Sequence, residues 1–359
     1  MRLRCRELSE GQWEQAYGEG AGAAVLWQRA VASDEALAQA CGEAQRSLDL
    51  SQGPLLRAVL LDLWDGTQRL LLVIHHLVVD GVSWRVLLED LSSAYQSLTA
   101  GREVALPAKT TSFQAWASRL ESYASSEALQ DEVSFWTSQV DEAAASFPCD
   151  YEAGSQRVRD QAEQRAILSA RETTQLLREA PSAYRTQVND LLLTALSRAL
   201  CRWSGSRSVS VELEGHGRED LFDDVDVSRT VGWFTSMYPV LLTPAADVGA
   251  SIKAVKEQLR AVPQRGIGFG VLSRWGEESV RRALATQARP RVTFNYLGQL
   301  DLSAGENGLF ALGDESVSSG QDGDVPLLNL LSVNGAVSSG QLSLSFAYSR
   351  ELFEEDTVA

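Results

Sequence analysis

The segment LLVIHHLVVDGVSW, residues 71–84, sets the local fold around two of the three histidines of the chain. Its apolar run, Leu70 to His76, follows an earlier run from Leu55 to Trp64, and Asp65-Gly66 stands between the two, which predicts a β-hairpin. The histidines therefore end a strand where a loop begins, a common place for functional side chains. Beyond the loop, Ser83 is expected to cap a helix that ends before Gly101.

The adjacent histidines, His75 and His76, should point to opposite faces of that strand, so only one of them can face a given cavity. Asp80 can bond local backbone or a neighbouring arginine and so fix the loop, and Gly81 permits a φ that other residues resist. Imidazole is a common acid/base group near neutral pH. From residue types alone, a packed structural role remains the more common outcome for such a pair.

A second candidate is EGHGRE, residues 214–219, which follows an alternating run that predicts a strand from Val209 to Leu213. The glycines on either side of His216 let the backbone turn sharply or approach another segment closely. Read alone, the segment is more typical of a polar turn than of a catalytic site. His216 is expected to be solvated, which makes it the weakest base candidate of the three histidines.

Other possible sites lack the pattern that their chemistry requires. The acidic cluster at Asp223, Asp224 and Asp226 lacks the spacing and glycine of a calcium loop. PQRGIGFG, residues 263–270, is not a GxGxxG dinucleotide loop, and Ser83 has no GxSxG context. No CxxC pair occurs, so we expect no metal site and no disulfide, and reduced thiols at Cys5, Cys41, Cys149 and Cys201.

The composition is that of a globular protein. The chain has 359 residues, 44% of them hydrophobic and 22% charged, which suits two domains of ordinary size. Predicted helices at 33–48, 113–140 and 188–203 interleave with predicted strands at 237–242, 292–296, 327–333 and 342–348. The expected class is therefore α/β or α+β. A capping box at Ser169–Glu172 predicts a further helix start, and the Gly-, Ser- and acid-rich residues 305–324 predict a surface loop.

The charge and the absence of long apolar runs exclude several function classes. The net charge is −16, which argues against nucleic acid and against an anionic membrane as partners. No apolar stretch reaches the roughly eighteen residues that a membrane helix needs, and the first residues lack the apolar core of a signal peptide. We therefore expect a cytoplasmic protein.

HHLVVDGVSW resembles the HHxxxDG signature of the condensation-domain superfamily, whose fold is like that of chloramphenicol acetyltransferase. Further segments resemble the epimerization branch of nonribosomal peptide synthetases, and they stand in family order over nearly the whole chain. They are LPAKTTSFQAWA (106–117), AYRTQVNDLLLTAL (183–196), VELEGHGRE (211–219), RTVGWFTSMYPVLL (229–242), PQRGIGFG (263–270) and FNYLGQLD (294–301).

The resemblance implies an α/β fold (two-layer α+β) of two lobes in a V-shaped pseudo-dimer with a tunnel at their interface. We expect an N-terminal lobe at 1–146, a linker at 147–162 and a C-terminal lobe at 163–359. Family members have about 70 to 80 further residues before the point that corresponds to Met1, a large part of an ordinary domain. The expectation is an incomplete N-terminal lobe and a shortened final helix after Tyr348.

The resemblance also implies a reaction and roles for individual residues. A peptidyl carrier protein would deliver an aminoacyl or peptidyl thioester on its phosphopantetheine arm, and the α-carbon would be converted from L to D. His76 and Glu214 would be the two acid/base groups, and Asp80 would be structural. No cofactor or metal would be bound, and neighbouring synthetase modules would be further partners. Residues expected to line or shape the site are His75, Gly81, Ser83, Trp233, Thr235, Asn295 and Tyr296.

Two alternatives remain open. The chain could be a condensation enzyme that joins two carrier-bound acyl groups, or an inactive domain that only recruits a carrier protein. Glu214 favours epimerization over condensation, because condensation needs no second base at that place. Intact His76 and Glu214 together argue against the inactive domain.

Overall fold

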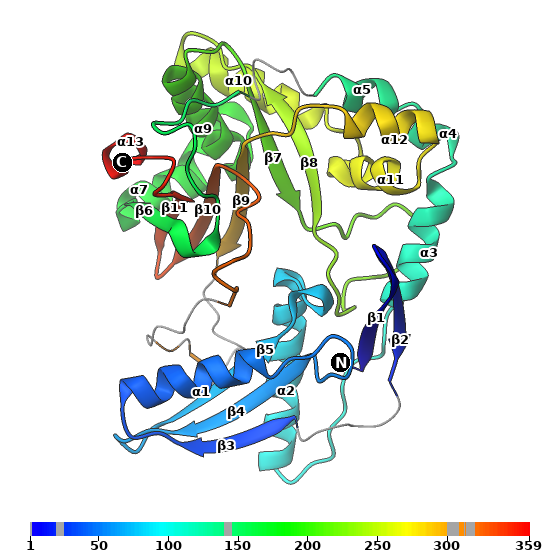
Figure 1. Cartoon of the computed structure of the whole chain (residues 1–359), viewed down its shortest axis with the longest axis vertical. Coiled ribbons are helices and arrows are strands. Elements are labelled where there is room, and N and C mark those ends of the chain that lie inside the picture. Colours follow the sequence, from blue (N-terminus) through cyan, green and yellow to red (C-terminus); the bar gives the residue numbers. More distant parts are fainter. Residues whose placement is uncertain (1, 19–24, 140–145, 300–308, 312, 314–319) are drawn as a thin grey trace. The chain divides into compact units, whose positions relative to one another are not determined.

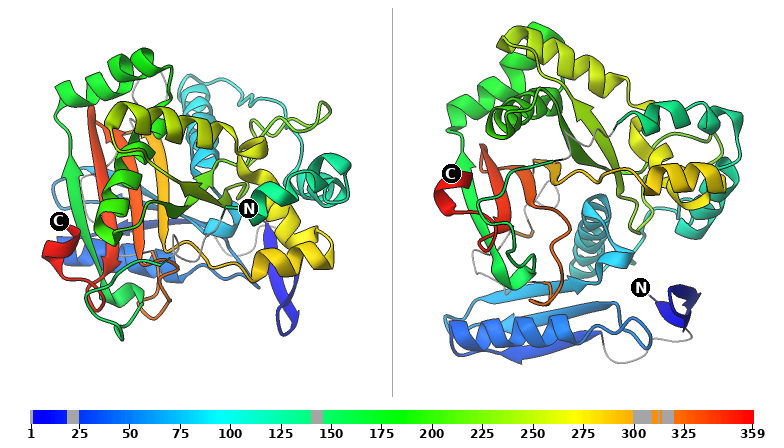
Figure 2. Two further views of the ribbon diagram at one scale, coloured as in Figure 1. Left: turned by 90° about the horizontal axis from the view of Figure 1, so that it is seen from above. Right: turned by 45° about the horizontal axis from the view of Figure 1, so that its top comes forward.

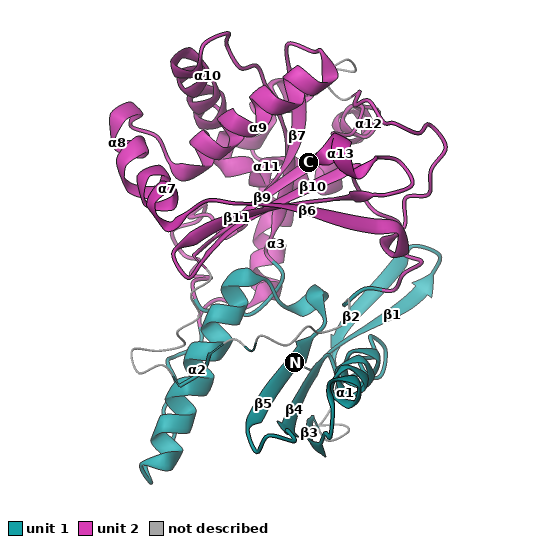
Figure 3. Cartoon of the chain, turned by 90° about the vertical axis from the view of Figure 1, so that its left-hand side faces the viewer, with its two compact units in different colours: residues 1–109, 229–233, 302–321 teal, residues 110–228, 234–301, 322–359 magenta. Residues whose placement is uncertain are grey.

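The computed structural model describes residues 2–18, 25–139, 146–299, 309–311, 313 and 320–359. Most of the surface loop predicted at 305–324 therefore lies outside the described residues, as do Val140 at the end of a predicted helix and residues 300–301 of the FNYLGQLD segment. The chain divides into two compact units (Figure 3). Unit 1 comprises Met1–Lys109, Arg229–Trp233 and Leu302–Gln321; unit 2 comprises Thr110–Ser228, Phe234–Asp301 and Asp322–Ala359.

Unit 1 contains a three-stranded sheet in the order β3-β4-β5 (Leu26–Ala30, Leu56–Asp62, Gln68–Ile74). The hairpin predicted around Asp65-Gly66 is confirmed, because β4 and β5 pair antiparallel and Gly66 has a φ of 82°. Helix α1 (Asp34–Arg46) begins after the predicted N-cap Ser33 and covers one face of the sheet (Figure 1). The hydrophobic core between this helix and the sheet consists of Val31, Leu37, Cys41, Ala44, Val59, Leu61 and Leu63.

Two further elements of unit 1 are the hairpin of β1 (Leu3–Ser9) and β2 (Gln12–Tyr17), and the helix α2 (Gly81–Thr99). The sequence patterns did not predict the hairpin. Its second strand is exposed along its whole length, so it carries no alternation of buried and exposed residues that a pattern could reveal.

Unit 2 is built on a six-stranded sheet in the order β6-β11-β10-β9-β7-β8. These strands are β6 Gln161–Ile167, β7 Val209–Gly215, β8 Ser236–Leu242, β9 Val292–Gln299, β10 Leu331–Ser338 and β11 Gln341–Ser349. The central strand β9 runs parallel to both neighbours, and the other pairs are antiparallel. The strand predicted at 327–333 begins later, at Leu331, because Leu328 is 85% exposed and the buried alternation starts only after it.

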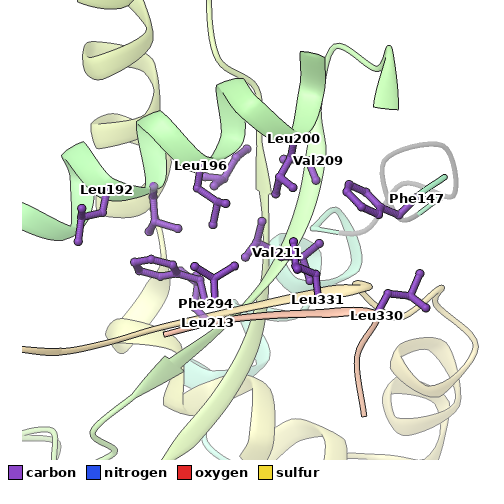
Figure 4. Packing of buried hydrophobic residues seen from close by; sticks show 14 of the residues in the cluster. Phe147, Leu192, Leu196, Leu200, Val209, Val211, Leu213, Phe294, Leu330 and Leu331 are labelled. Atoms are coloured by element: carbon purple, nitrogen blue, oxygen red, sulfur yellow. The ribbon is translucent and has the colours of Figure 1, made fainter. Parts of the chain in front are cut away.

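The core of unit 2 lies on one face of this sheet, where α9 (Val188–Ser204) and α10 (Val248–Arg260) pack (Figure 2). Leu192, Leu196 and Leu200 recur every four residues on α9, so they share one helix face and contact the sheet (Figure 4). Helix α9 ends at Ser204 and is capped by Gly205 with a φ of 71°, within one residue of the helix end predicted at 203. Strand residues in this cluster include Val209, Val211, Leu213, Val292, Phe294, Leu331 and Val333.

The continuous helix predicted from Phe113 to Val140 is wrong. The chain forms three short helices, α3 (Phe113–Tyr123), α4 (Glu127–Gln130) and α5 (Val133–Thr137), and Ser126 is the N-cap of the second. Their buried side chains, including Leu129 and Trp136, pack against α11 (Ile267–Trp275) and α12 (Glu278–Ala285) of unit 2. The compact units therefore divide between Lys109 and Thr110, and the lobe boundary at 146/147 stays a prediction.

Short elements complete the described structure. The predicted capping box at Ser169–Glu172 is confirmed at the start of α7. None of the helices in the described ranges is long and apolar enough to cross a membrane. The remaining elements are η1 His76–Val78, η2 Val158–Asp160, α7 Ala170–Thr174, the π-helical turn η3 Gln175–Glu179, α8 Ala180–Tyr184, η4 Pro263–Gly266 and α13 Glu355–Val358.

The glycines of PQRGIGFG allow close packing. A Cβ on Gly266 would lie 2.0 Å from the ring of Tyr238, and Gly266 has a φ of +92°. A Cβ on Gly268 would lie 2.0 Å from a carboxylate oxygen of Glu132. Gly266 therefore lets η4 pack against the ring of Tyr238. Burial of this side chain raises the pKa of Tyr238 to about 12. Gly268 lets α11 approach a buried carboxyl group.

That buried carboxyl group, Glu132, predicts a pH-dependent stability. Glu132 is 7% exposed and accepts a hydrogen bond from Trp136 Nε1 at 2.9 Å, and burial raises its pKa. A raised pKa means that the folded state favours the protonated carboxyl of Glu132. The contribution of this group to the free energy of unfolding is therefore complete below the pKa of the unfolded state and is lost as pH rises through the pKa of the folded state. The variant Glu132→Gln cannot ionise, so its free energy of unfolding should increase relative to that of the wild type as pH rises above about 4.5, the ordinary pKa of a glutamate. Urea unfolding at several pH values measures this, and the exposed Glu121→Gln is the control. Parallel pH profiles for wild type and Glu132→Gln would contradict it.

Candidate active site

The loop that follows β5 fixes the first histidine, His75, to the backbone. Its N–H donates to Leu55 O at 3.0 Å, which extends the β4–β5 hairpin by one residue. Its Nδ1 accepts from Leu77 N at 3.2 Å, and this role needs an unprotonated nitrogen. Burial, and secondarily the charge of the adjacent His76, lower the pKa of His75 in agreement with that role. His75 thus holds the loop in place.

The second histidine, His76, is exposed. It opens the short turn η1, and its ring centroid lies 4.9 Å from that of Trp233 at an interplanar angle of 59°. Trp233 is itself 41% exposed. Of the two adjacent histidines, His76 is therefore the more exposed, with an aromatic ring packed on one side of it.

The start of α2 differs from the expectation in the residue that caps it. The cap is Asp80, which is 4% exposed and whose Oδ1 accepts from Ser83 N at 2.7 Å, so the prediction that Ser83 caps the helix is wrong. Asp80 takes that place because its backbone is extended at φ −129°, whereas Ser83 already lies in the first helical turn. Gly81 does not use the conformational freedom of a glycine: its φ is not positive, and a Cβ there would meet nothing within 4 Å.

Ser83 instead ties α2 to the segment Arg229–Trp233 of the same unit. Its hydroxyl is fully buried, donates to Gly232 O at 2.9 Å and accepts from Gly232 N at 3.1 Å. At the other end of the segment, Arg229 forms ion pairs with Glu89 at 2.9 Å and Asp90 at 2.5 Å, both on α2. These contacts hold Trp233 beside His76. Arg229 and Gly232 were not predicted as site residues, because no local pattern reveals a partner 149 residues away.

The variant Ser83→Ala should loosen this segment. It leaves both the N–H and the C=O of Gly232 without the buried hydroxyl, and each unsatisfied group costs about 1–3 kcal/mol. We expect the free energy of unfolding to fall by at least about 2 kcal/mol and the Gly232 amide to exchange faster with deuterated solvent. The exposed Ser93→Ala on the same helix should change stability by less than about 0.5 kcal/mol. An equal loss in both variants would contradict this role of Ser83.

In unit 2, Glu214 lies near the end of β7 beside Asn295 of β9. The two strands run parallel with Leu213 opposite Phe294, so the next residues along the strands meet. Asn295 Nδ2 donates to Glu214 Oε2 at 2.8 Å. Because Leu213 and Phe294 point into the core, Glu214 and Asn295 lie on the opposite face of the sheet. Asn295 therefore orients the carboxylate.

The structure does not bring Tyr296 to Glu214. The ring of Tyr296 lies on the other face of β9 and packs against the core of unit 2, where burial raises its pKa. Gly335 on β10 pairs with it, and a Cβ at that glycine would lie 3.2 Å from the ring. Thr235 directly precedes β8, whose first residue, Ser236, pairs with Gly215. Tyr296 supports β9 from the core side, while Asn295 contacts the candidate base.

The turn after β7 confirms the close approach expected from its glycines. Gly217 has a φ of +65°, and a Cβ there would lie 1.7 Å from Phe234 O. His216 stabilises the turn, since its Nδ1 accepts from Arg218 N at 3.0 Å and its Nε2 lies 3.3 Å from Glu219 Oε1. Its side chain is 47% exposed. Within the part of the chain that the structure describes, no group of three or more His, Cys, Asp or Glu is placed to hold a metal ion.

Comparison with known sequences matches residues 1–359 to the Condensation domain family. Surfactin synthase subunit 1 of Bacillus subtilis (strain 168) is 44% identical over 317 residues, which are 88% of this chain and 9% of that protein. Tyrocidine synthase 1 of Brevibacillus parabrevis is 40% identical over 326 residues, which are 87% of this chain and 30% of that protein. The chain thus spans less than a third of the length of either of these relatives.

Comparison with solved structures matches the epimerization domain from the third module of tyrocidine synthetase B. The TM-score is 0.90 at 36% identity, over 99% of this chain and 81% of that domain. The X-domain from teicoplanin biosynthesis aligns with a TM-score of 0.72 at 19% identity, over 100% of this chain and 80% of that one. At that identity the second match shows the fold alone, which is the chloramphenicol acetyltransferase-like fold that the sequence motifs predicted.

Proposed function

Because this chain belongs to the condensation-domain family of nonribosomal peptide synthetases, we propose that it is an epimerization domain that inverts the α-carbon of an acyl thioester. The observation that carries the proposal is the match to an epimerization domain, at 36% identity and a TM-score of 0.90 over 99% of this chain. The hydrogen-bonded pair of Glu214 and Asn295 supports it at the level of residues.

The proposed reaction removes a proton from one face of the α-carbon and returns a proton to the other. His76 and Glu214 are the two acid/base groups, and each serves one face of the substrate. Removing the proton places negative charge on the thioester oxygen, so hydrogen-bond donors near that oxygen lower the barrier. Asn295 holds one carboxylate oxygen of Glu214 at 2.8 Å and so limits the orientations of the base. Trp233 does the same for the imidazole of His76 through ring packing at 4.9 Å.

The proposed substrate arrives on the phosphopantetheine arm of a peptidyl carrier protein, and this domain binds no cofactor of its own. The proposal names the carrier and the neighbouring synthetase modules as partners, since the relatives are multidomain synthetases of which this chain spans 4 to 30%. A net charge of −16 makes any contact with an acidic carrier depend on local basic side chains.

Condensation is the second candidate, because the matching family bears that name. A condensation enzyme takes two carrier-bound acyl groups and needs no base at the position of Glu214. An inactive recruiting domain, the third candidate, has no need of an accessible His76 or of an oriented carboxylate. The side-chain arrangement around Glu214 therefore favours epimerization over both.

Solvent deuterium incorporation tests the proposal. An L-aminoacyl or L-peptidyl carrier protein is incubated with the chain in heavy water, and the released acid is analysed for deuterium at the α-carbon and for the D/L ratio. We expect deuterium at the α-carbon and a mixture of D and L products. Formation of a peptide bond between two loaded carriers, without exchange, would replace epimerization by condensation. No exchange and no bond formation, beside an active epimerization domain assayed in parallel, would overturn the proposal.

A further inference from the structure

The six-stranded sheet of unit 2 has a polar face opposite α9 and α10. On β10, Leu331, Val333 and Val337 point into the core, so the alternating residues Ser332 and Asn334 point to the other side. Strands β7, β9 and β11 follow the same alternation, with core residues on one side and polar ones on the other. The polar face is defined by Glu212, Glu214, Thr293, Asn295, Ser332, Asn334, Ser343 and Ser345.

Within this face, one row of polar side chains starts at Glu214 and crosses the strands. Asn295 donates to Glu214, Asn334 is the register partner of Asn295, and Ser345 is the register partner of Asn334. Neighbouring strands lie about 4.8 Å apart, so the row extends about 14 Å from Glu214 to Ser345. The strands β9, β10 and β11 lie side by side in this order (Figure 1).

The far part of the row has unused hydrogen-bonding capacity. Asn334 is exposed and Ser345 half-buried, and among the described residues neither side chain makes a hydrogen bond. An asparagine amide offers two donors and an acceptor, and a serine hydroxyl offers a donor and acceptors. The next residue in register, Arg165, forms an ion pair with Glu163 of its own strand. Between Glu214 and that ion pair, the side chains of the row are therefore uncharged. An uncharged row of hydrogen-bonding side chains is complementary to the neutral backbone of a peptide.

We infer that the row Asn295–Asn334–Ser345 is a binding subsite for the peptide part of a peptidyl thioester, an inference that rests on the proposed function. The reacting α-carbon must lie at Glu214, and the peptide extends from that carbon. An extended peptide advances about 3.3 Å per residue, so 14 Å accommodates about four residues. Each peptide unit carries one donor and one acceptor, which side-chain amides and hydroxyls can pair. The chain accordingly favours a peptidyl substrate of several residues over a single aminoacyl group.

The double variant Asn334→Ala/Ser345→Ala tests this subsite by direct binding. The probes are carrier proteins whose arm bears a tetrapeptide or a single amino acid through a stable amide in place of the thioester. We expect the variant to bind the tetrapeptidyl carrier about tenfold more weakly and the aminoacyl carrier unchanged. The matched control is Ser338→Ala, an exposed hydroxyl on the same strand and face but four residues further along. It should leave both affinities unchanged, and thermal unfolding should show that all variants are folded.

The outcomes separate the subsite from the proposed function. An equal loss for both carriers would assign the row to the phosphopantetheine arm, and no loss for either would remove it from substrate binding; each overturns the inference. Because the probes do not react, the binding result holds even if wild-type protein shows no α-proton exchange. Where exchange occurs, kcat/KM for tetrapeptidyl thioesters should fall about tenfold in the double variant, while that for aminoacyl thioesters stays constant.

Discussion

Replacing Glu214 by glutamine should lower the rate of epimerization by about a hundredfold or more, the usual contribution of an acid/base group. Glutamine keeps the shape of the side chain, and its carbonyl oxygen can still accept the hydrogen bond that Asn295 donates at 2.8 Å. The substitution therefore removes the proton-carrying group and preserves the contact with Asn295. The measurement is the initial rate of D/L conversion on a loaded carrier protein, with thermal unfolding as the check on folding.

The matched control for Glu214→Gln is Glu212→Gln. Glu212 is two residues earlier on β7, on the same face, and accepts a hydrogen bond from Asn329 Nδ2 at 3.3 Å. It shares residue type, strand and face with Glu214 but lacks the contact with Asn295. We expect Glu212→Gln to retain most of the activity. An unchanged rate in Glu214→Gln would remove Glu214 from the mechanism, and equal losses in the two variants would point to a general effect of charge on this face.

Replacing His76 by glutamine should lower the rate of D/L conversion to a similar extent, again by about a hundredfold or more. His76 is exposed and its ring packs at 4.9 Å from Trp233, so its loss leaves no void in the core. His216→Gln is the control, because that histidine lies in a turn and bonds only neighbours in sequence among the described residues. A His76→Gln protein that converts L to D at the wild-type rate would contradict the assignment.

The variants Glu214→Gln and His76→Gln should differ in which enantiomer of the substrate still exchanges its α-proton, a difference that a mechanism with one base does not produce. With one acid/base group for each face, a variant that lacks one group can still exchange the α-proton of the enantiomer that the other group serves. Each variant should therefore incorporate deuterium into one enantiomer without inverting it. If Glu214→Gln exchanges the α-proton of one enantiomer, His76→Gln should exchange that of the other. Exchange into the same enantiomer by both variants would exclude a two-base mechanism with these residues.

Local sequence patterns predicted most of the strands whose alternate residues are buried and most of the helices that bury one face. The β4–β5 hairpin, α1 after Ser33, the capping box at Ser169 and the end of α9 at Gly205 all follow from short-range chemistry, and all are present. The failures occur where burial depends on distant partners. The break of the helix predicted from Phe113 is one case, since Leu129 and Trp136 pack against α11 and α12. The late start of β10 at Leu331 is another, because Leu328 is apolar yet 85% exposed.

The sequence by itself determined the family motifs, the identity of the candidate acid/base residues and the strand that ends at each. It could not say which contacts orient them, because those contacts join residues 81 and 149 positions apart. Only the tertiary structure shows that Asn295 bonds Glu214 and that Tyr296 lies on the opposite face of β9. Only the tertiary structure shows that Ser83, which was expected to cap a helix, bonds Gly232 instead. Strand register and long-range burial decide such contacts, and neither is encoded in a local pattern of residue types.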